Sequence, residues 1–208
     1  MKIIAFNGSP HKDGNTYQAL SAVLAEVAKS GIETEIVQVG SATIAGCLGC
    51  GGCMNNKNEK CVIATDQVNE WFQLAKEADG FIIGSPVYFA GVAGTMKCFL
   101  DRFFYINFAN NNLFRHKIGA SVVALRRSGG TVTWDELNRF FMSSEMILPT
   151  SNYWNIVHGL TSGEIEQDKE GIQVLKILGE NIAFATKAIH AAKGTEAPQQ
   201  EKEFTNFI

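Results

Sequence analysis

The stretch that decides the fold is Met1-Lys2-Ile3-Ile4-Ala5-Phe6-Asn7 followed directly by Gly8-Ser9-Pro10-His11-Lys12-Asp13-Gly14-Asn15-Thr16. The first part predicts a short apolar strand. The glycine and hydroxyl residues after it predict a loop, and a helical pattern begins at Thr16. This order directs backbone N–H groups, hydroxyls and a helix N-terminus to one point above the strand, which suits a phosphate. A nucleotide-type cofactor is therefore the first hypothesis.

The residues of this loop favour a monophosphate. Ser9 and Thr16 can donate hydroxyls, Asn15 can cap the helix and donate through its amide, and His11 and Lys12 can add charge. The loop lacks both the Gly-x-Gly-x-x-Gly fingerprint of dinucleotide sites and the Gly-Lys-Ser/Thr of a Walker A sequence. Neutral donors at a helix N-terminus suit a terminal monophosphate better than a triphosphate with Mg²⁺. The alternative is an ordinary capped turn.

Apolar strands alternate with amphipathic helical segments along most of the chain. Strands are expected at Lys2–Asn7, Glu33–Val39, Gly80–Ser85, Ile118–Leu125 and Ser151–Val157. Helices are expected near Thr16–Ser30, Asp66–Glu77, Gly94–Asn107, Trp134–Met146 and Gly171–Ala192. Five strands, each followed by a helix, predict an α/β fold with a doubly wound five-stranded parallel sheet and helices on both faces.

Length and composition bound the class of protein. The 208 residues suit one domain, expected over residues 1–193, with a polar tail over 194–208. Residues 40–65 form the longest irregular stretch, and we expect a cysteine-containing insertion loop there. A net charge of −3 gives no reason to expect nucleic acid or an anionic membrane as partner. With no membrane-length apolar run and no signal-peptide pattern, the expected location is the cytoplasm.

A second loop follows the strand that begins at Gly80, and it reads Pro86-Val87-Tyr88-Phe89-Ala90-Gly91. Pro86 restricts the preceding residue to extended conformations and ends the strand. Tyr88 and Phe89 then lie at the same edge of the sheet as the first loop, where they offer an apolar surface to a flat ring. Gly91 allows the backbone to approach a ligand closely. For Phe89 the alternative is a place in the core or in a subunit contact.

These two loops together resemble the flavodoxin-like NAD(P)H-dependent FMN reductase family, most closely its iron–sulfur flavoprotein branch. The similarity is carried by Asn7-Gly8-Ser9-Pro10 with Gly14-Asn15-Thr16, and by Gly84-Ser85-Pro86-Val87-Tyr88-Phe89 with Lys97 and Asp101-Arg102, and it covers roughly residues 1–130. The resemblance implies bound FMN. Its implied contacts are Ser9, Asn15 and Thr16 at the phosphate, and Pro86, Val87, Tyr88, Phe89 and Gly91 along the ring. His11 in the first loop can lie over the flavin, and its alternative is an exposed loop position without a role. A third contact loop is implied at Arg126, Ser128 and Gly129.

Four of the five cysteines, Cys47, Cys50, Cys53 and Cys61, fall in one glycine-rich segment, while Cys98 suits a small core position. A C-x2-C-x2-C run can curl around an Fe–S cluster with the fourth thiolate arriving later in the chain. The pattern resembles the cysteine motif of iron–sulfur flavoproteins, which carries a [4Fe–4S] cluster. Unmetallated thiols, a structural Zn²⁺ and a redox-active disulfide remain as alternatives.

The expected function is an FMN-dependent oxidoreductase that passes electrons from NAD(P)H to a quinone or another small acceptor. If the cluster exists, ferredoxin becomes an equally good donor. No side chain is expected to be catalytic, because the chemistry resides in the flavin. A non-enzymatic electron carrier or redox sensor is the main alternative, and a hydrolase or nucleotide-binding regulator is another. The aromatic segment Phe99–Phe108 predicts a homodimer or tetramer, and Asp101-Arg102 reads as a structural charge pair.

Overall fold

The computed structural model describes residues 1–205. Its sheet has five parallel strands in the order β2-β1-β3-β5-β6. Their bounds are Lys2–Asn7 for β1, Glu33–Gln38 for β2, Gly80–Tyr88 for β3, Ile118–Leu125 for β5 and Ile156–His158 for β6. The central strands are buried on both faces, as their near-continuous apolar sequences require. The predicted doubly wound sheet is confirmed.

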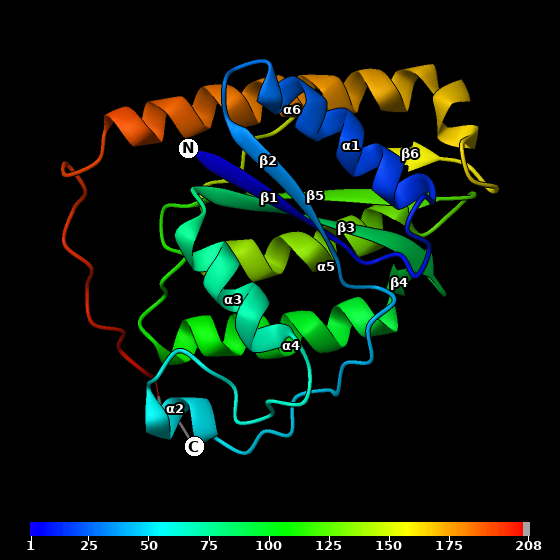
Figure 1. Ribbon diagram of the computed structural model, residues 1–208. Helices are drawn as coiled ribbons and strands as arrows, with labels where there is room; N and C mark the ends of the chain where they lie inside the picture. The colour runs from blue at the N-terminus through cyan, green and yellow to red at the C-terminus, as the bar shows by residue number, and fades with distance from the viewer. Residues whose placement is uncertain (206–208) are drawn as a thin grey trace.

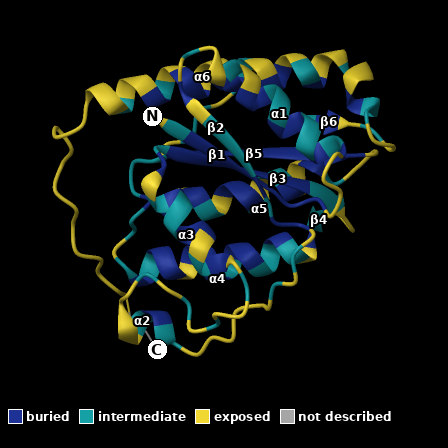
Figure 2. Cartoon of the chain, in the orientation of Figure 1, coloured by how far each residue is buried: buried dark blue, intermediate teal, exposed yellow. Residues whose placement is uncertain are grey.

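Helices cover both faces of this sheet (Figure 1). Helices α1 (Asn15–Ala28) and α6 (Lys169–Ala191) pack against one face. Helices α3 (Val68–Glu77), α4 (Gly94–Ala109) and α5 (Gly130–Met142) pack against the other. A short helix α2 (Gly52–Asn56) and a 3-10 helix (Glu164–Gln167) complete the helices of residues 1–205. Figure 2 shows the buried sheet between layers whose outer surfaces are exposed.

The aromatic residues of α4 belong mainly to the core. Phe99 and Phe103 are fully buried and Phe104 nearly so, whereas Tyr105 is about two-fifths exposed. Phe103 and Phe81 each place their ring centroid 5.0 Å from that of Phe114. Burial of such rings contributes both apolar area and favourable edge-to-face contacts. Phe99, Phe103 and Phe104 are therefore core residues, although the prediction of a subunit interface was based on their segment.

Two predicted elements differ from the structure by four residues or more at one end or both. The last strand was expected at Ser151–Val157, but only Ile156–His158 pair with β5, and residues 151–155 form a loop held by Asn155. The Asn155 Nδ2 donates to Ser121 O at 3.1 Å. Helix α5 begins four residues before the expected Trp134, because Gly129 adopts φ 89° and turns the chain into the helix there.

Strand β3 continues past its expected end at Ser85 and folds back as a hairpin. Its last residues pair with the antiparallel strand β4 (Gly91–Val92). The two residues of the turn, Phe89 and Ala90, have φ of 50° and 58°, which matches the left-handed backbone that a two-residue hairpin needs. The parallel sheet therefore carries a short antiparallel hairpin at the carboxyl end of β3.

The polar tail, as far as residue 205, contacts the segment that follows α4. The Arg115 guanidinium donates to Ala197 O at 3.2 Å, and Gln199 Nε2 donates to Asn111 O at 3.1 Å. Figure 1 shows this segment running from the end of α6 towards α2. Residues 206–208 of the predicted tail lie outside the described residues. In residues 1–205 no helix has both the length and the apolar character needed to cross a membrane.

Candidate functional site

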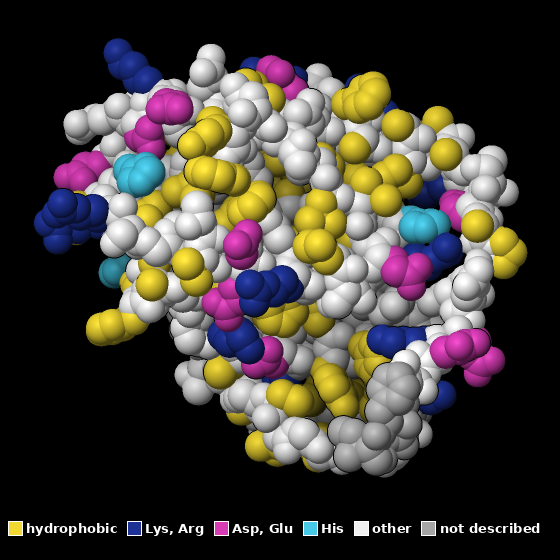
Figure 3. Space-filling view, turned by 180° about the vertical axis from the view of Figure 1, so that it is seen from behind, with side chains coloured by type: hydrophobic (Ala, Val, Ile, Leu, Met, Phe, Trp, Pro, Cys, Tyr) yellow, Lys and Arg dark blue, Asp and Glu magenta, His cyan; other side chains and the backbone are white. Residues whose placement is uncertain are grey.

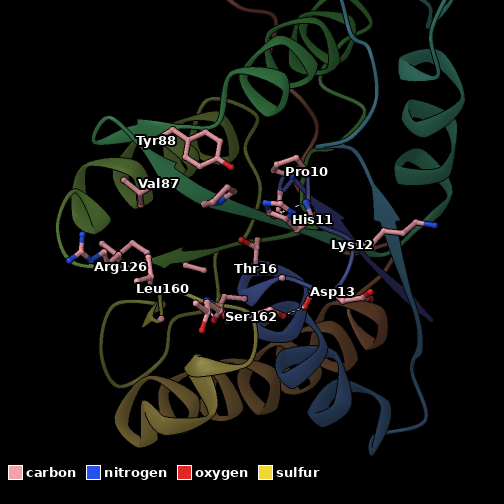
Figure 4. A pocket seen from close by; sticks show the side chains of 18 residues that line it. Pro10, His11, Lys12, Asp13, Thr16, Val87, Tyr88, Arg126, Leu160 and Ser162 are labelled. Atoms are coloured by element: carbon pink, nitrogen blue, oxygen red, sulfur yellow. Dashed lines mark hydrogen bonds between the residues drawn. The ribbon is translucent and has the colours of Figure 1, made fainter.

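A cavity of about 860 Å³ opens at the carboxyl ends of β1, β3 and β5, the edge of an open α/β sheet where ligands bind (Figure 4). Its walls come from four loops. The lining residues are Ser9, Pro10, His11, Lys12, Asp13, Gly14, Asn15, Thr16, Pro86, Val87, Tyr88, Ala124, Leu125, Arg126, Gly159, Leu160, Thr161 and Ser162. Eight residues predicted to contact a cofactor therefore share one cavity: Ser9, His11, Asn15, Thr16, Pro86, Val87, Tyr88 and Arg126.

The loop after β1 is shaped by side chains of the two neighbouring strands. Asn7 Nδ2 donates to Gln38 Oε1 at 2.6 Å, and Asn7 Oδ1 accepts from the backbone N–H of Ser9 at 3.1 Å. Gln38 Nε2 in turn donates to Ser9 O at 2.6 Å. Ser9 Oγ accepts from the His11 N–H at 3.1 Å, so its own hydroxyl proton is left to donate. Asn7 and Gln38 fix a loop that exposes hydroxyl and N–H donors.

Helix α1 points its N-terminus into the same cavity. No side chain caps this end and no acidic residue lies in its first turn. Its first N–H groups are therefore free to bind an anion, and the helix dipole favours one. Thr16 is buried at the base of the cavity and faces its interior in Figure 4. In the same view Lys12 and Arg126 extend outward on opposite sides.

The Asn15 side chain lies in the cavity wall but contacts protein on both of its polar atoms. Its Nδ2 donates to Thr161 O at 2.9 Å and its Oδ1 accepts from Gly163 N–H at 3.1 Å. Ser162 Oγ adds a hydrogen bond to Asp13 O at 2.6 Å. The loop Gly159–Ser162 thus joins the cavity through Asn15. This loop was not predicted from the sequence, although its position after the last strand of the sheet was a usable signal.

The β3–β4 hairpin supplies the apolar side of the cavity. Pro86, Val87 and Tyr88 line it, whereas Phe89 at the hairpin tip is fully exposed and lines no part of it. Gly91 lies against α5, where a Cβ would be 3.7 Å from Glu136 Oε2. The structure therefore brings three of the five predicted ring contacts together.

The third predicted loop divides between two cavities. Arg126 borders the main cavity, while Ser128 and Gly129 line a neighbouring one of about 360 Å³. Gly129 packs closely against the hairpin, since a Cβ there would lie 2.7 Å from Ala90 Cα. Its contact with the hairpin makes Gly129 part of the support of the cavity wall.

The four clustered cysteines line one small pocket. Cys47, Cys50, Cys53 and Cys61 share its wall with residues of α4. Cys47 and Cys50 are exposed, Cys61 is half-buried and Cys53 is buried. Burial raises the pKa of the Cys53 thiol, and the neighbouring Cys61 and Cys47 raise it further. The void measures about 20 Å³, room for about one water molecule.

Arg102 of α4 forms the floor of this pocket. The guanidinium is fully buried and forms an ion pair with Asp66. Its Nε donates to Cys61 Sγ at 3.4 Å. Burial by itself lowers the pKa of Arg102, but the hydrogen bonds to Asp66 and Cys61 outweigh burial and the pKa lies above its ordinary value. The predicted structural pair of Asp101 with Arg102 is not formed, because Asp101 pairs with Lys97 at 2.6 Å and Arg102 with Asp66.

The donor set of this pocket suits a cluster, although the thiols do not yet surround a common point. Within residues 1–205 no three His, Cys, Asp or Glu side chains stand close enough to hold a metal ion. Four thiols are the ligands of a [4Fe–4S] cluster. Two of them lie on a glycine-rich arm, residues 46–52, where Gly49 and Gly51 have φ of 61° and 70° and open space around them. A [4Fe–4S] cluster would need the four thiols closer together than they lie here, and the predicted ligand set stays a prediction.

The geometry has close counterparts among known proteins. The model of the NADPH-dependent FMN reductase family matches residues 1–161. An iron–sulfur flavoprotein of Methanocaldococcus jannaschii is 34% identical over 91% of this chain and 99% of its own length. One from Methanosarcina thermophila is 30% identical over 84% of this chain and 90% of its own. The crystal structure of a WrbA-like flavodoxin from Agrobacterium tumefaciens covers 90% of this chain and 97% of its own, with a TM-score of 0.61 at 14% identity.

The fold and the cavity above its strand ends define a flavodoxin-like flavoprotein. This chain belongs to the NADPH-dependent FMN reductase family. It is therefore a flavin oxidoreductase by family, and the resemblance read from its two loops is confirmed.

Proposed function

We propose that this protein holds FMN in the 860 Å³ cavity and passes electrons from NAD(P)H or ferredoxin, through the flavin, to a quinone or another small acceptor. One observation carries the proposal: the cavity combines an uncapped helix N-terminus at one end with an apolar hairpin wall at the other. The first suits a monophosphate and the second a flat ring.

The cofactor-binding residues divide into two groups. Ser9, Thr16 and the first N–H groups of α1 are the phosphate donors, with His11 at their side. Val87 and Tyr88 support the ring, and Arg126 is the cation available to its pyrimidine edge. When bound, FMN supplies hydride and single-electron transfer, and the protein supplies binding, orientation and electrostatics.

We further propose a [4Fe–4S] cluster on Cys47, Cys50, Cys53 and Cys61. The support is their shared pocket, together with relatives that are named iron–sulfur flavoproteins. A cluster makes a one-electron donor such as ferredoxin as suitable as NAD(P)H. Free thiols and a cluster both suit a reducing compartment, which favours the cytoplasm.

One preparation tests these proposals. Protein purified without oxygen is examined by its visible spectrum and by iron and zinc analysis, and then mixed with NADH, NADPH or reduced ferredoxin and a quinone. We expect flavin absorbance, four irons per chain and acceptor-dependent turnover with at least one donor. Colourless protein would remove the flavin proposal, and zinc in place of iron would remove the cluster proposal.

A second function, a non-enzymatic electron carrier, has one observation in its favour. The cysteine pocket is lined by Arg102, Tyr105 and Ile106 from the second half of α4, whereas the β3–β4 hairpin, whose β3 residues line the main cavity, lies beside the beginning of that helix (Figure 1). The two candidate redox sites are therefore separate. A carrier predicts that the flavin exchanges electrons with ferredoxin but is never reduced by NAD(P)H. Stopped-flow reduction by each donor separates the two functions.

We propose that the protein assembles as a homodimer or tetramer. Figure 3 shows hydrophobic side chains gathered over the middle of the rear face. Among exposed residues, Met142, Tyr153 and Trp154 line a further cavity of about 600 Å³. Exposed apolar surface of this kind often marks an association site. Sedimentation or gel filtration at monomer size would contradict this proposal.

A further inference from the structure

Arg102 touches the cysteine segment on both sides of its cysteines. Besides Cys61 and Asp66, the guanidinium donates through Nη1 to Ala45 O at 3.3 Å and through Nη2 to Ile63 O at 2.9 Å. Ala45 precedes the first clustered cysteine, and Ile63 and Asp66 follow the last. One side chain of α4 therefore holds both ends of the segment.

Among the clustered cysteines, Cys61 is held by hydrogen bonds with two side chains of the neighbouring helices. Its backbone N–H donates to Asn69 Oδ1 at 2.7 Å and its carbonyl accepts from Asn69 Nδ2 at 3.0 Å. Its sulfur accepts from Arg102. Cys47 and Cys50, in contrast, are exposed on the glycine-rich arm. Cys53 is buried in α2 and Cys61 is fixed by these side chains, so two thiols already have a defined place onto which the arm can close.

We propose that Arg102 is a positioning residue that fixes Cys61 as a ligand of the cluster site and raises the reduction potential of the cluster held there. The inference rests on the proposed [4Fe–4S] cluster. Hydrogen bonds to the ligand sulfurs and nearby charge set the potential of such clusters. A buried cation that donates to a ligand sulfur favours the reduced form, which carries one more negative charge.

The guanidinium is suited to this role in a way that lysine is not. Its planar fork directs Nε to the sulfur while Nη1 and Nη2 reach Asp66 and two carbonyls. A lysine keeps the charge but has a single nitrogen, so it cannot reproduce all four contacts. An ion pair needed only for stability would not require the Nε contact with Cys61.

The test compares Arg102→Met and Arg102→Lys with Asp101→Asn, a control on the same helix. Asp101 pairs with Lys97 and has no recorded contact with the segment in residues 1–205. Each protein is reconstituted with iron and sulfide without oxygen, and iron content and the midpoint potential of the cluster are measured by EPR-monitored titration. Amide hydrogen exchange of residues 61–66 is measured on the metal-free proteins.

We expect wild type and D101N to share one potential. R102M should disfavour reduction by at least tenfold, which is about 59 mV for a one-electron couple, and R102K should fall between them. Exchange of residues 61–66 should be at least tenfold faster in R102M than in D101N. The inference is overturned if R102M holds the cluster and its midpoint potential equals that of D101N. If R102M takes up no iron, the inference is overturned when the cluster of R102K has the midpoint potential of D101N.

The metal-free measurement separates this inference from the proposed cluster. If wild type takes up FMN but no iron, the cluster proposal fails. Exchange at residues 61–66 that is equal in R102M and D101N then removes the positioning role of Arg102 as well. If exchange is faster in R102M but not in D101N, Arg102 still orders the segment around Cys61, although no cluster is present whose potential it could change.

Discussion

Oδ1 of Asn15 accepts a hydrogen bond at 3.1 Å from the backbone N–H of Gly163, a residue 148 positions later in the chain. Because Nδ2 of the same side chain donates to Thr161 O, Asn15 places the loop Gly159–Ser162 in the cavity wall. Its amide is occupied by protein contacts. We therefore expect Asn15 to support FMN binding mainly through this loop.

Asn15→Ala should weaken FMN binding about tenfold, because the loop loses two hydrogen bonds of about 1 kcal/mol each. Asn15→Asp keeps the acceptor for Gly163 but adds a negative charge near the phosphate. It should weaken FMN more than riboflavin, which lacks the phosphate. Fluorescence titration of the apoprotein with both flavins measures this. Equal losses for FMN and riboflavin in Asn15→Asp would place the phosphate elsewhere.

Thr16→Val removes one hydroxyl while keeping the shape of a buried side chain. FMN affinity should fall about tenfold, since a hydrogen bond to a charged group contributes about 1.5–3 kcal/mol. Riboflavin affinity should stay within about twofold, and the melting temperature of the apoprotein should change little. An unchanged dissociation constant for FMN would show that Thr16 does not donate to the phosphate.

Gly40→Ala should disturb the loop after β1, because Gly40 packs directly against the backbone of Gly8 and Ser9. A Cβ at Gly40 would lie 2.3 Å from Gly8 O and from the Ser9 carbonyl, and backbone cannot move aside cheaply. We expect a loss of about 1–3 kcal/mol in the free energy of unfolding, together with weaker FMN binding. Gly94→Ala is the matched control, because its Cβ meets nothing within 4 Å. Urea denaturation of the two variants decides whether the close approach matters.

Asp66→Ala should cost far more than Asp101→Ala. Asp66 and Arg102 are both almost completely buried, so removal of the carboxylate leaves an unpaired buried charge, at about 3–5 kcal/mol. Asp101 and Lys97 form an exposed pair that contributes less than about 1 kcal/mol. Denaturant unfolding gives both values. Similar losses in the two variants would mean that the buried pair has no special role in stability.

Asp79 should contribute a pH-dependent part of the stability. Burial alone raises its pKa, but the Lys2 N–H at 2.8 Å and Lys193 at 3.2 Å outweigh burial, so the pKa lies below the ordinary 3.8. A lowered carboxyl pKa stabilises the fold above the unfolded value and loses that contribution as pH falls through the folded value. The stability difference between wild type and Asp79→Asn should therefore shrink between pH 5 and pH 2. A constant difference would contradict this assignment.

The sequence predicted best those elements whose residues are uniform in character. The bounds of β1 and β5 were predicted correctly, because their apolar runs end in polar or glycine-rich turns. The prediction for the last strand was wrong because the apolar residues of that segment include Tyr153 and Trp154, which are exposed in a loop. Periodicity does not distinguish an apolar loop from a short buried strand.

Residues of the cavity could be predicted where a loop directly follows the end of a strand, as in the loops after β1 and β3. Ser9 and Thr16 lie in such a loop, and both line the cavity. Gln38 shapes the same loop from a neighbouring strand, and its contact with Ser9 depends on strand order that the sequence does not state. Phe89 was assigned to the ring for its aromatic character, but at the left-handed turn of the hairpin it is fully exposed and does not line the cavity.

The cavity wall also has a consequence for biosynthesis. The first residue of the chain that lines the cavity is Ser9 and the last is Ser162. A nascent chain in which only the loops after β1 and β3 have been synthesised therefore still lacks one side of the cavity. For FMN bound as proposed, we therefore expect full retention only after β6 and the loop Gly159–Ser162 have folded beside α1. Because a ligand stabilises only the state that binds it, FMN selects finished molecules over partly made ones.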